Sequence, residues 1–216
     1  MPEPTDDTEP LPKRKMPRES RRQQLIESTI EVLAARGYAS TTLTEVARKA
    51  GLSHGLVNFH FTAKENLLSE TLLYLSEEYR ANTQTYLNAA GPTAAEQLDA
   101  LMRADFDPKV SSPARVSAWL AFWGEAQGRP LYQQSVGGND EKFVTYMEEL
   151  CAQIVAQGGY ALNVQRAARV LRVTGEGMWL DMVTMKTPYD MAEGQATVYA
   201  VAAAFFPQHF GPDGLL

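Results

Sequence analysis

Residues 41–61 read TTLTEVARKAGLSHGLVNFHF and contain the start and stop signals of two short helices. Thr42 and Glu45 have the spacing of a capping box, in which the hydroxyl accepts from the Glu45 amide and the carboxylate returns to the Thr42 amide. Gly51 is expected to end the first helix, and Ser53 can cap the second. Two short helices joined by a tight glycine turn, and preceded by a longer helix, predict a helix-turn-helix.

The segments on both sides of this stretch also predict helices. An i, i+4, i+7, i+8 apolar spacing before it is formed by Leu25, Thr29, Val32 and Leu33. Gly37 is expected to end that helix after Arg36. Thr62 and Glu65 form a second pair with capping-box spacing, which predicts the start of a long helix.

Helical periodicity continues through the rest of the chain, and we find no sustained alternation that would indicate a strand. The predicted helices cover 94–106, 113–127, 140–157, 162–184 and 191–206, and the pattern leaves open whether 130–157 is one kinked helix or two. We therefore predict an all-α protein of about nine helices. Its parts are a disordered arm at 1–15, a helix-turn-helix domain at 16–64, and a larger ligand-binding and dimerisation domain at 65–216.

The net charge of -6 conceals an asymmetry along the chain. Residues 1–10 carry -4, residues 11–66 carry +5 and residues 67–216 carry -7. A basic block on an acidic body is typical of a polyanion-binding module, although chance clustering around KRKMPRESRR gives the same charge.

Other features of the chain concern its location. The acidic, proline-rich start has no apolar core, so it is not a signal peptide, and the longest apolar runs are too short to span a bilayer. The single cysteine, Cys151, excludes an intrachain disulfide. We expect a reducing, cytoplasmic setting and no membrane partner.

The second short helix has residue types that suit DNA better than metal or catalysis. His54 and Asn58 are four apart and share a face, where asparagine can pair with adenine and histidine can donate to a base or phosphate. His54 and His60 lie about 120° apart around a helix, which does not suit a pair of metal ligands. No acid–histidine–nucleophile arrangement is found, so an enzyme is not expected, and neither is a cofactor.

Residues 41–68, TTLTEVARKAGLSHGLVNFHFTAKENLL, resemble the DNA-binding module of TetR-family transcriptional regulators. The match rests on Gly37, Thr42, Val46, Ala47, Ala50, Gly51, Ser53, Gly55, Phe61, Lys64 and Leu67. The resemblance implies that DNA is faced by Thr42, Thr44, His54, Gly55, Asn58, Phe59 and His60. It also implies that Lys64 approaches a phosphate. Many members carry an aromatic residue where this chain has Asn58, so their base preference does not transfer.

Residues 104–134, ADFDPKVSSPARVSAWLAFWGEAQGRPLYQQ, resemble the choline-sensing BetI branch, which represses genes for glycine betaine synthesis. Trp119 and Trp123 are four apart on one helix face, and Trp179 lies on another helix. Aromatic faces and a nearby acid hold a quaternary ammonium, because its nitrogen has no hydrogen to donate. The candidate ligand-binding residues are Phe106, Trp119, Trp123, Tyr132, Glu176 and Trp179, with the acid to be found among Asp105, Asp107, Glu176 and Asp181. The plain alternative is that the tryptophans are core residues.

The last two predicted helices, 162–184 and 191–206, carry apolar residues more continuously than a monomer surface does. The family resemblance implies that they form a homodimer interface, and Val198 and Phe205 are candidates to face the partner. The leading expectation is a repressor released from a near-palindromic operator by a choline-like ligand. The alternatives are a TetR-type repressor of a hydrophobic drug or acyl compound, an all-helical enzyme, and a ligand-free architectural DNA binder.

Overall fold

The computed structural model describes residues 17–125, 136, 138–188 and 190–216, and the predicted all-α class is confirmed. The elements are α1 (Arg18–Ser40), α2 (Leu43–Ala50), α3 (His54–His60), α4 (Lys64–Ala89), α5 (Ala94–Asp105), α6 (Pro108–Ser111), α7 (Pro113–Glu125), α9 (Gly138–Gly158), α10 (Val164–Thr184), α11 (Met191–Phe205), β1 (Phe210–Gly211) and β2 (Gly214–Leu215). The predicted arm lies outside the described residues. Within the described ranges, no helix is both long enough and apolar enough to cross a membrane.

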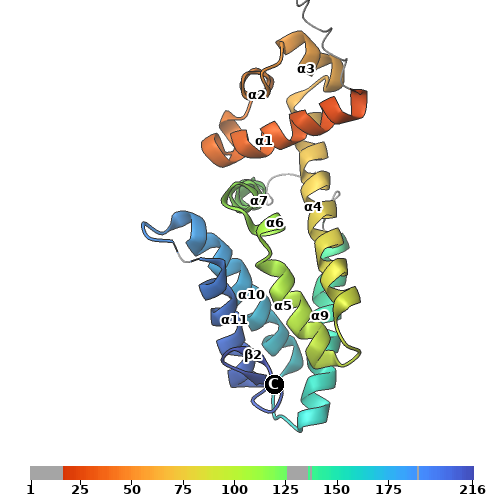
Figure 1. The fold of residues 1–216 in the computed structure, drawn as a ribbon, viewed down its shortest axis with the longest axis vertical. Helices are drawn as coiled ribbons and strands as arrows, with labels where there is room; N and C mark the ends of the chain where they lie inside the picture. Colours follow the sequence, from red (N-terminus) through yellow and green to blue (C-terminus); the bar gives the residue numbers. More distant parts are fainter. Residues whose placement is uncertain (1–16, 126–135, 137, 189) are drawn as a thin grey trace, which may run out of the picture.

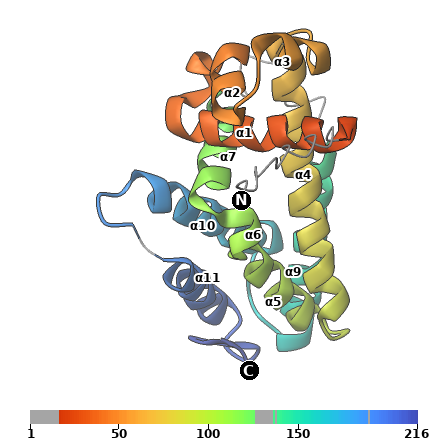
Figure 2. The same cartoon turned by 45° about the horizontal axis from the view of Figure 1, so that its top comes forward.

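Helices α1, α2 and α3 form one end of an elongated molecule, and α5, α9, α10 and α11 form the other (Figure 1). The long helix α4 runs from the first end into the second, so it belongs to both. Helix α7 lies directly beneath α1 and packs against it, as both views show (Figure 2). The two ends are therefore joined by α4 on one side and by α7 on the other.

The local signals of the helix-turn-helix are formed largely as predicted. The Thr42 hydroxyl accepts from the Glu45 amide at 3.2 Å. The Glu45 carboxylate does not return to Thr42, however, because it pairs with Arg48 at 2.7 Å and with Arg36 at 3.2 Å. Gly51 closes α2 with a left-handed φ of 66°, a conformation that glycine adopts at little cost.

The second predicted capping box is wrong. Helix α4 is preceded by Ala63, which makes no side-chain cap, and the Thr62 hydroxyl accepts instead from Asn66 at 3.1 Å. A complete capping box is present at the start of α5, where Thr93 and Glu96 bond reciprocally. The spacing alone does not decide which pair forms, because the glutamate can turn to a competing partner.

The core follows the predicted apolar spacing. Leu25, Thr29, Val32 and Leu33 are all buried on α1. Gly37 interrupts α1 with a φ of 74°, so the helix breaks where the sequence predicts, although regular hydrogen bonding resumes through Ser40. Tyr38, just after this break, meets Phe122 of α7 edge to face at 5.8 Å between ring centres.

A short antiparallel hairpin at the C-terminus departs from the purely helical expectation. Phe210 pairs with Leu215, and Gly211 pairs with Gly214. The two residues between the paired glycines are Pro212 and Asp213, and a proline followed by a polar residue and a glycine is typical of a tight turn. The hairpin covers one end of the helical core, since Phe210 is buried.

Candidate functional site

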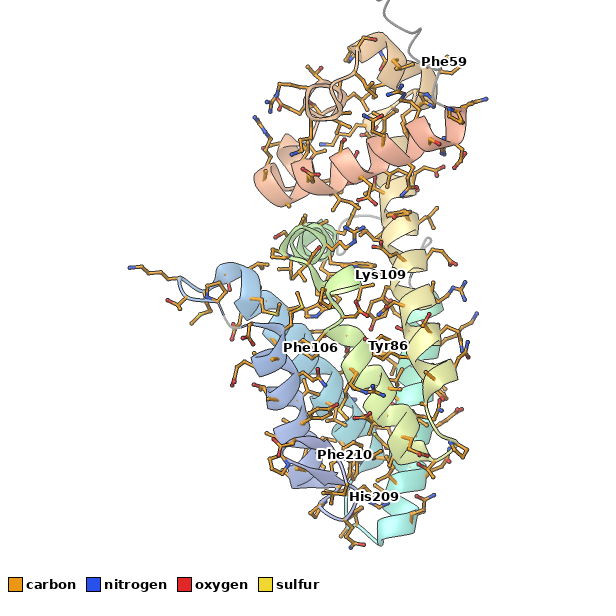
Figure 3. The ribbon with its side chains drawn as sticks, viewed as in Figure 1. Phe59, Tyr86, Phe106, Lys109, His209 and Phe210 are labelled. Atoms are coloured by element: carbon orange, nitrogen blue, oxygen red, sulfur yellow. The ribbon has the colours of Figure 1, made fainter. Side chains whose placement is uncertain are left out.

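Helix α3 presents most of its predicted DNA-facing residues to solvent. His54, Gly55, Asn58 and Phe59 are exposed. Phe59 is 66% exposed and lies at the end of the molecule opposite the C-terminal hairpin (Figure 3). Val57 is fully buried and anchors the helix, so the polar face is fixed outward.

The remaining predicted contacts flank this face. Thr42 and Thr44, at the start of α2, are exposed, and His60 is half-buried. The side chains of His54 and Asn58 are bonded to each other, with Asn58 Nδ2 and His54 Nδ1 separated by 3.1 Å. The predicted shared face is therefore confirmed, and the two groups form one polar unit in the free protein.

Arginines from the start of α1 border α3, which the sequence indicated only as a charged cluster. The Arg18 guanidinium lies over the Phe59 ring at 5.6 Å, and that of Arg22 lies over the buried Phe61 ring at 4.8 Å. Burial, followed by the charges of Arg18, Arg22 and Arg21, lowers the pKa of His60. This surface therefore presents polar side chains of the type that contact base edges, and arginines at its edge of the type that contact phosphates. A DNA-binding surface needs both.

Lys64 is held within the chain in this structure. Its Nζ donates to the carbonyl oxygens of Tyr38 at 2.9 Å and Ala39 at 3.0 Å, and lies over the Tyr38 ring at 5.4 Å. These carbonyls close the end of α1, where a cation is favourable. The phosphate contact implied by the family resemblance stays a prediction.

A cavity of about 560 Å³ lies in the other part of the molecule. Five helices contribute to its wall, and that volume falls in the range of about 300–1,000 Å³ typical of small-molecule sites. The lining residues are Ser76, Tyr79, Arg80, Thr83, Gln84 and Leu87 of α4, Asp105 of α5, Trp119 and Trp123 of α7, Asp140, Phe143 and Val144 of α9, and Arg172, Gly175, Glu176 and Trp179 of α10.

All three tryptophans of the chain line this cavity. Trp123 stacks on Trp179 with ring centres 6.3 Å apart and planes 15° apart. It also lies 6.1 Å from Trp119, tilted by 34°. Tyr79 meets Trp179 and Phe143 nearly edge-on, each at 6.2 Å. The result is a continuous aromatic wall drawn from four helices.

One buried carboxylate adjoins that wall. The Tyr79 hydroxyl donates to Asp105 Oδ1 at 2.5 Å, and Trp179 Nε1 donates to the Asp105 carbonyl at 3.0 Å. Asp105 keeps some accessible surface because it faces the cavity, but protein surrounds its carboxyl group. Burial raises the pKa of this carboxyl to about 7, and the negative charge of Glu176 adds to the effect while the Tyr79 hydrogen bond opposes it.

The other candidate acids have partners or lie elsewhere. Glu176 lines the cavity, but its carboxylate pairs with Arg172 at 2.5 Å. Asp107 caps α6 and accepts from the Tyr86 hydroxyl, and neither it nor Asp181 lines the cavity. Of the four candidate acids, Asp105 is thus the one that lines the cavity and is bonded there to the Tyr79 hydroxyl and not to a base.

Two predicted ligand-binding residues do not join this group. Phe106 is 4% exposed and does not line the cavity, because its ring turns away and packs against Gly194 of α11. Figure 3 places it between α5 and the α10–α11 side of the molecule. Tyr132 lies outside the described residues. Tyr79 was missed because its spacing continues the buried side of α4, and periodicity does not distinguish a core position from a cavity wall.

Helix α7 connects the cavity to the DNA-binding end. Arg115, near its start, donates to Glu78 of α4 at 2.6 Å and to Glu27 of α1 at 3.3 Å. Trp119 and Trp123 follow one and two turns later on the same helix. One helix therefore carries both part of the cavity wall and a contact with α1.

An exposed apolar face covers α10 and α11. On α10, the side chains of Val170, Val173 and Leu180 are 37%, 49% and 45% exposed. On α11, an exposed row of small residues is formed by Ala192, Ala196, Ala200 and Ala204. Val198 points the other way and is 3% exposed, so the expectation that it could face a partner is wrong. Phe205 is half-buried.

Comparison with protein families gives two matches that together cover most of the chain. Residues 25–71 match the tetR family of bacterial regulatory proteins, and residues 94–207 match the C-terminal domain of BetI-type transcriptional repressors. Among curated proteins, the chain is 28% identical over 199 residues to the HTH-type transcriptional regulator BetI of Escherichia coli O139:H28 (strain E24377A / ETEC). The BetI of Shigella flexneri serotype 5b (strain 8401) has the same identity. In each case the match covers 89% of this chain and 95% of the relative.

Solved structures share the fold. A putative transcriptional regulator from Pseudomonas aeruginosa PAO1 superposes with a TM-score of 0.73 at 23% identity, covering 89% of this chain and 93% of that one. A putative transcriptional regulator from Saccharomonospora viridis, solved in complex with choline, has a TM-score of 0.72 at 18% identity, covering 85% and 95%. The matched relatives are transcriptional regulators and not enzymes. The chain belongs to the TetR family of transcriptional regulators and joins a TetR-type DNA-binding module to a BetI-type repressor domain.

Proposed function

We propose that this protein represses transcription from a near-palindromic operator and that choline, or a related quaternary ammonium compound, releases it. The observation that carries the proposal is the stacked tryptophan wall beside the buried carboxyl of Asp105. The BetI relatives and the choline complex of the Saccharomonospora viridis regulator support the same ligand class. From the likeness to BetI, we infer further that the regulated genes are those of glycine betaine synthesis. We also propose that the protein acts in the cytoplasm.

The wall suits a quaternary ammonium for a physical reason. Such a nitrogen carries a full charge but no hydrogen to donate, so aromatic faces can replace its water without leaving a donor unpaired. Each desolvated cation–π contact contributes about 0.5–2 kcal/mol. Three indole rings from two helices are available here within one stack. A primary ammonium would lose hydrogen bonds to water that these rings do not return.

The acid favours a cation over the alternative acyl ligand. A fatty acid carries a carboxylate, which would face Asp105 and Glu176 across the cavity. Arg172 is already paired with Glu176, and Arg80 is paired with Glu77, so both bases of the wall are engaged. A ligand that brings its own positive charge complements the carboxyl of Asp105.

On the DNA side, the proposed contacts are those expected from the family resemblance. The His54–Asn58 pair would read a base edge, and the arginines of α1 would contact phosphates. One seven-residue helix offers limited specificity, so two copies are required. The exposed α10–α11 face within residues 162–206 supports a homodimer that places two α3 helices on one operator.

The decisive experiment is release of the purified protein from its own upstream DNA. We expect choline and betaine aldehyde to release it, since both keep the trimethylammonium head. Glycine betaine should bind less tightly because its carboxylate meets Asp105, and ethanolamine should bind less tightly because it keeps unpaired donors. Calorimetry on the same ligands separates binding from release. Absence of choline binding at millimolar concentration, with DNA binding intact, would reject the ligand and leave the DNA-binding function.

A further inference from the structure

Thr83 carries a buried hydroxyl with no hydrogen-bond partner. It lies on α4 one turn after Tyr79, lines the cavity, and is 9% exposed. Among the described residues it holds the single buried side-chain oxygen or nitrogen without a partner. Since an unpartnered buried hydroxyl is unfavourable, such a group in a cavity wall indicates a partner that arrives with the ligand.

Other threonines in the helices of this chain show what the usual arrangement is. Each donates its hydroxyl to the carbonyl four residues earlier, at 2.7–2.9 Å: Thr29, Thr71, Thr85, Thr145, Thr174, Thr184 and Thr197. Thr83 has the same option, because Tyr79 stands four residues before it on α4. It does not take that option, so its hydroxyl stays unpartnered on a residue that lines the cavity.

The Tyr79 hydroxyl does not satisfy Thr83 either. Burial and then Asp105 raise the pKa of that phenol well above its usual value, and the Thr83 side chain acts weakly in the opposite direction. However, it does not reach hydrogen-bonding geometry with the phenol. The Tyr79 hydroxyl is the donor in its hydrogen bond to Asp105. Tyr79 is thus already bonded to Asp105. Thr83 lies four residues further along α4, a rise of about 6 Å, and its hydroxyl has no partner.

From this arrangement we propose that Thr83 is a specificity-determining residue that binds the oxygen end of the ligand while the aromatic wall holds its quaternary ammonium head. The inference rests on the proposed function. Its ligand class is a quaternary ammonium with a hydroxyl or carbonyl oxygen two carbons from nitrogen, not a bare tetraalkylammonium. The hydroxyl can donate to a carbonyl oxygen and accept from an alcohol, so it serves either kind of ligand.

The test compares Thr83→Val with the parent protein, using choline and tetramethylammonium as probes. Valine matches threonine in shape and removes the hydroxyl alone. One neutral hydrogen bond corresponds to about a 3- to 10-fold change in affinity. We expect the parent to prefer choline over tetramethylammonium by about that factor, and Thr83→Val to lose the preference by weakening choline alone. Thr85→Val is the matched control, since Thr85 is exposed on the same helix and does not line the cavity.

The outcomes separate the two proposals. Binding of neither probe to the parent rejects the ligand class itself. Binding of both probes, with the choline preference unchanged in Thr83→Val, rejects the role of Thr83 and leaves the proposed function standing. Equal weakening of both probes also rejects it, because a general change of cavity shape would act on the shared head.

Thermal stability distinguishes a hydroxyl that stabilises the fold from one that is kept for the ligand. Thr71 is buried on the same helix and its hydroxyl is bonded to the Leu67 carbonyl. We expect Thr71→Val to lower Tm by about 2–4 °C, because it removes a satisfied hydrogen bond. Thr83→Val, which removes an unsatisfied one, should keep or raise Tm. A drop in Thr83→Val as large as that of Thr71→Val would show that the hydroxyl serves the fold and overturn the proposal.

Discussion

The α3 surface and the cavity are assembled in opposite ways. Every predicted DNA-facing residue of the first lies within about twenty-five consecutive positions, and its caps and glycine turn are local. The cavity wall draws on five helices that span residues 76–179. A surface built from neighbours in sequence can be identified by spacing, whereas a wall built from distant helices is defined only by how those helices pack.

The two regions also differ in what their polar groups do. On α3 they are exposed and bonded to each other, as His54 and Asn58 are. In the cavity the Asp105 carboxyl is surrounded by protein, and this burial changes its chemistry by raising its pKa to about 7. Changes on the surface should therefore act on DNA alone, and changes in the wall should act on the ligand alone.

The largest effect should come from the face that joins two copies of this arrangement. Val173→Asp places a charge on the exposed α10 surface and should weaken the dimer by about 3–5 kcal/mol, or more than about 100-fold. Operator binding should fall with it. Leu73→Asp is the control, because Leu73 is similarly exposed, at 44%, but lies on α4. Light scattering is the measurement, and a monomeric parent protein would contradict the interface.

Asn58→Ala should act on the surface alone. A bidentate base contact contributes about 1–3 kcal/mol of discrimination, so the variant should bind its operator less tightly and accept more bases at one position. Choline binding should be unchanged. Binding to a set of operators substituted one position at a time measures both effects. Unaltered affinity for the native operator would remove Asn58 from the base-reading set.

Trp123→Ala should act on the wall alone. Trp123 lies between Trp119 and Trp179, so its loss opens the stack and removes up to about 2 kcal/mol of cation–π attraction, about 30-fold in affinity. Operator affinity without ligand should stay within about twofold of the parent. Calorimetry and DNA release are read together. If Trp119→Ala and Trp123→Ala both respond to choline like the parent, the tryptophans are core residues only.

Ligand binding should depend on pH through Asp105. Its carboxyl pKa of about 7 stands above the usual 3.8, so the folded protein holds a proton that the unfolded chain loses, and stability falls as pH rises from about 4 through 7. A bound cation favours the ionised carboxylate. Choline affinity should therefore fall by up to about tenfold per pH unit below 7 and stay level above it.

The matched variant is Asp105→Asn, which keeps an oxygen to accept from Tyr79 but cannot ionise. It should bind choline less tightly at pH 8 and lose most of the pH dependence of both binding and stability. Titrations at several pH values, in buffers of different ionisation enthalpy, count the proton released. A pH profile in Asp105→Asn that matches the parent would assign the effect to another group.

The smallest effect concerns Lys64, at the start of α4. If it leaves the α1 carbonyls to contact a phosphate, Lys64→Ala should lower the slope of log affinity against log salt by about one. Its bonds to Tyr38 and Ala39 predict in addition a modest loss of thermal stability. Loss of stability with an unchanged salt slope would restrict Lys64 to its role within the chain.

Much of the fold follows from short-range physics that is legible in the sequence. The i, i+4, i+7 burial on α1, the breaks at Gly37 and Gly51 and the caps at Thr42 and Ser53 each depend on a few neighbouring residues. The pairing of Trp119 with Trp123 depends on one helical turn, and it was predicted. The exposed face of His54 and Asn58 was predicted for the same reason.

Tertiary structure decided the questions that depend on long-range packing. It placed the Asp105 carboxyl beside the aromatic wall, because Tyr79 and Trp179 from two other helices converge on that residue, and it left Asp107 and Asp181 outside the cavity lining. It turned Phe106 toward α11, although an aromatic residue was expected in the ligand site. It also buried Val198, although an apolar residue on that helix was expected at the dimer interface. A single sequence states which residues share a helix face, but which face meets a cavity, a core or a partner is set by the angle at which the helices pack, and no local spacing encodes that angle.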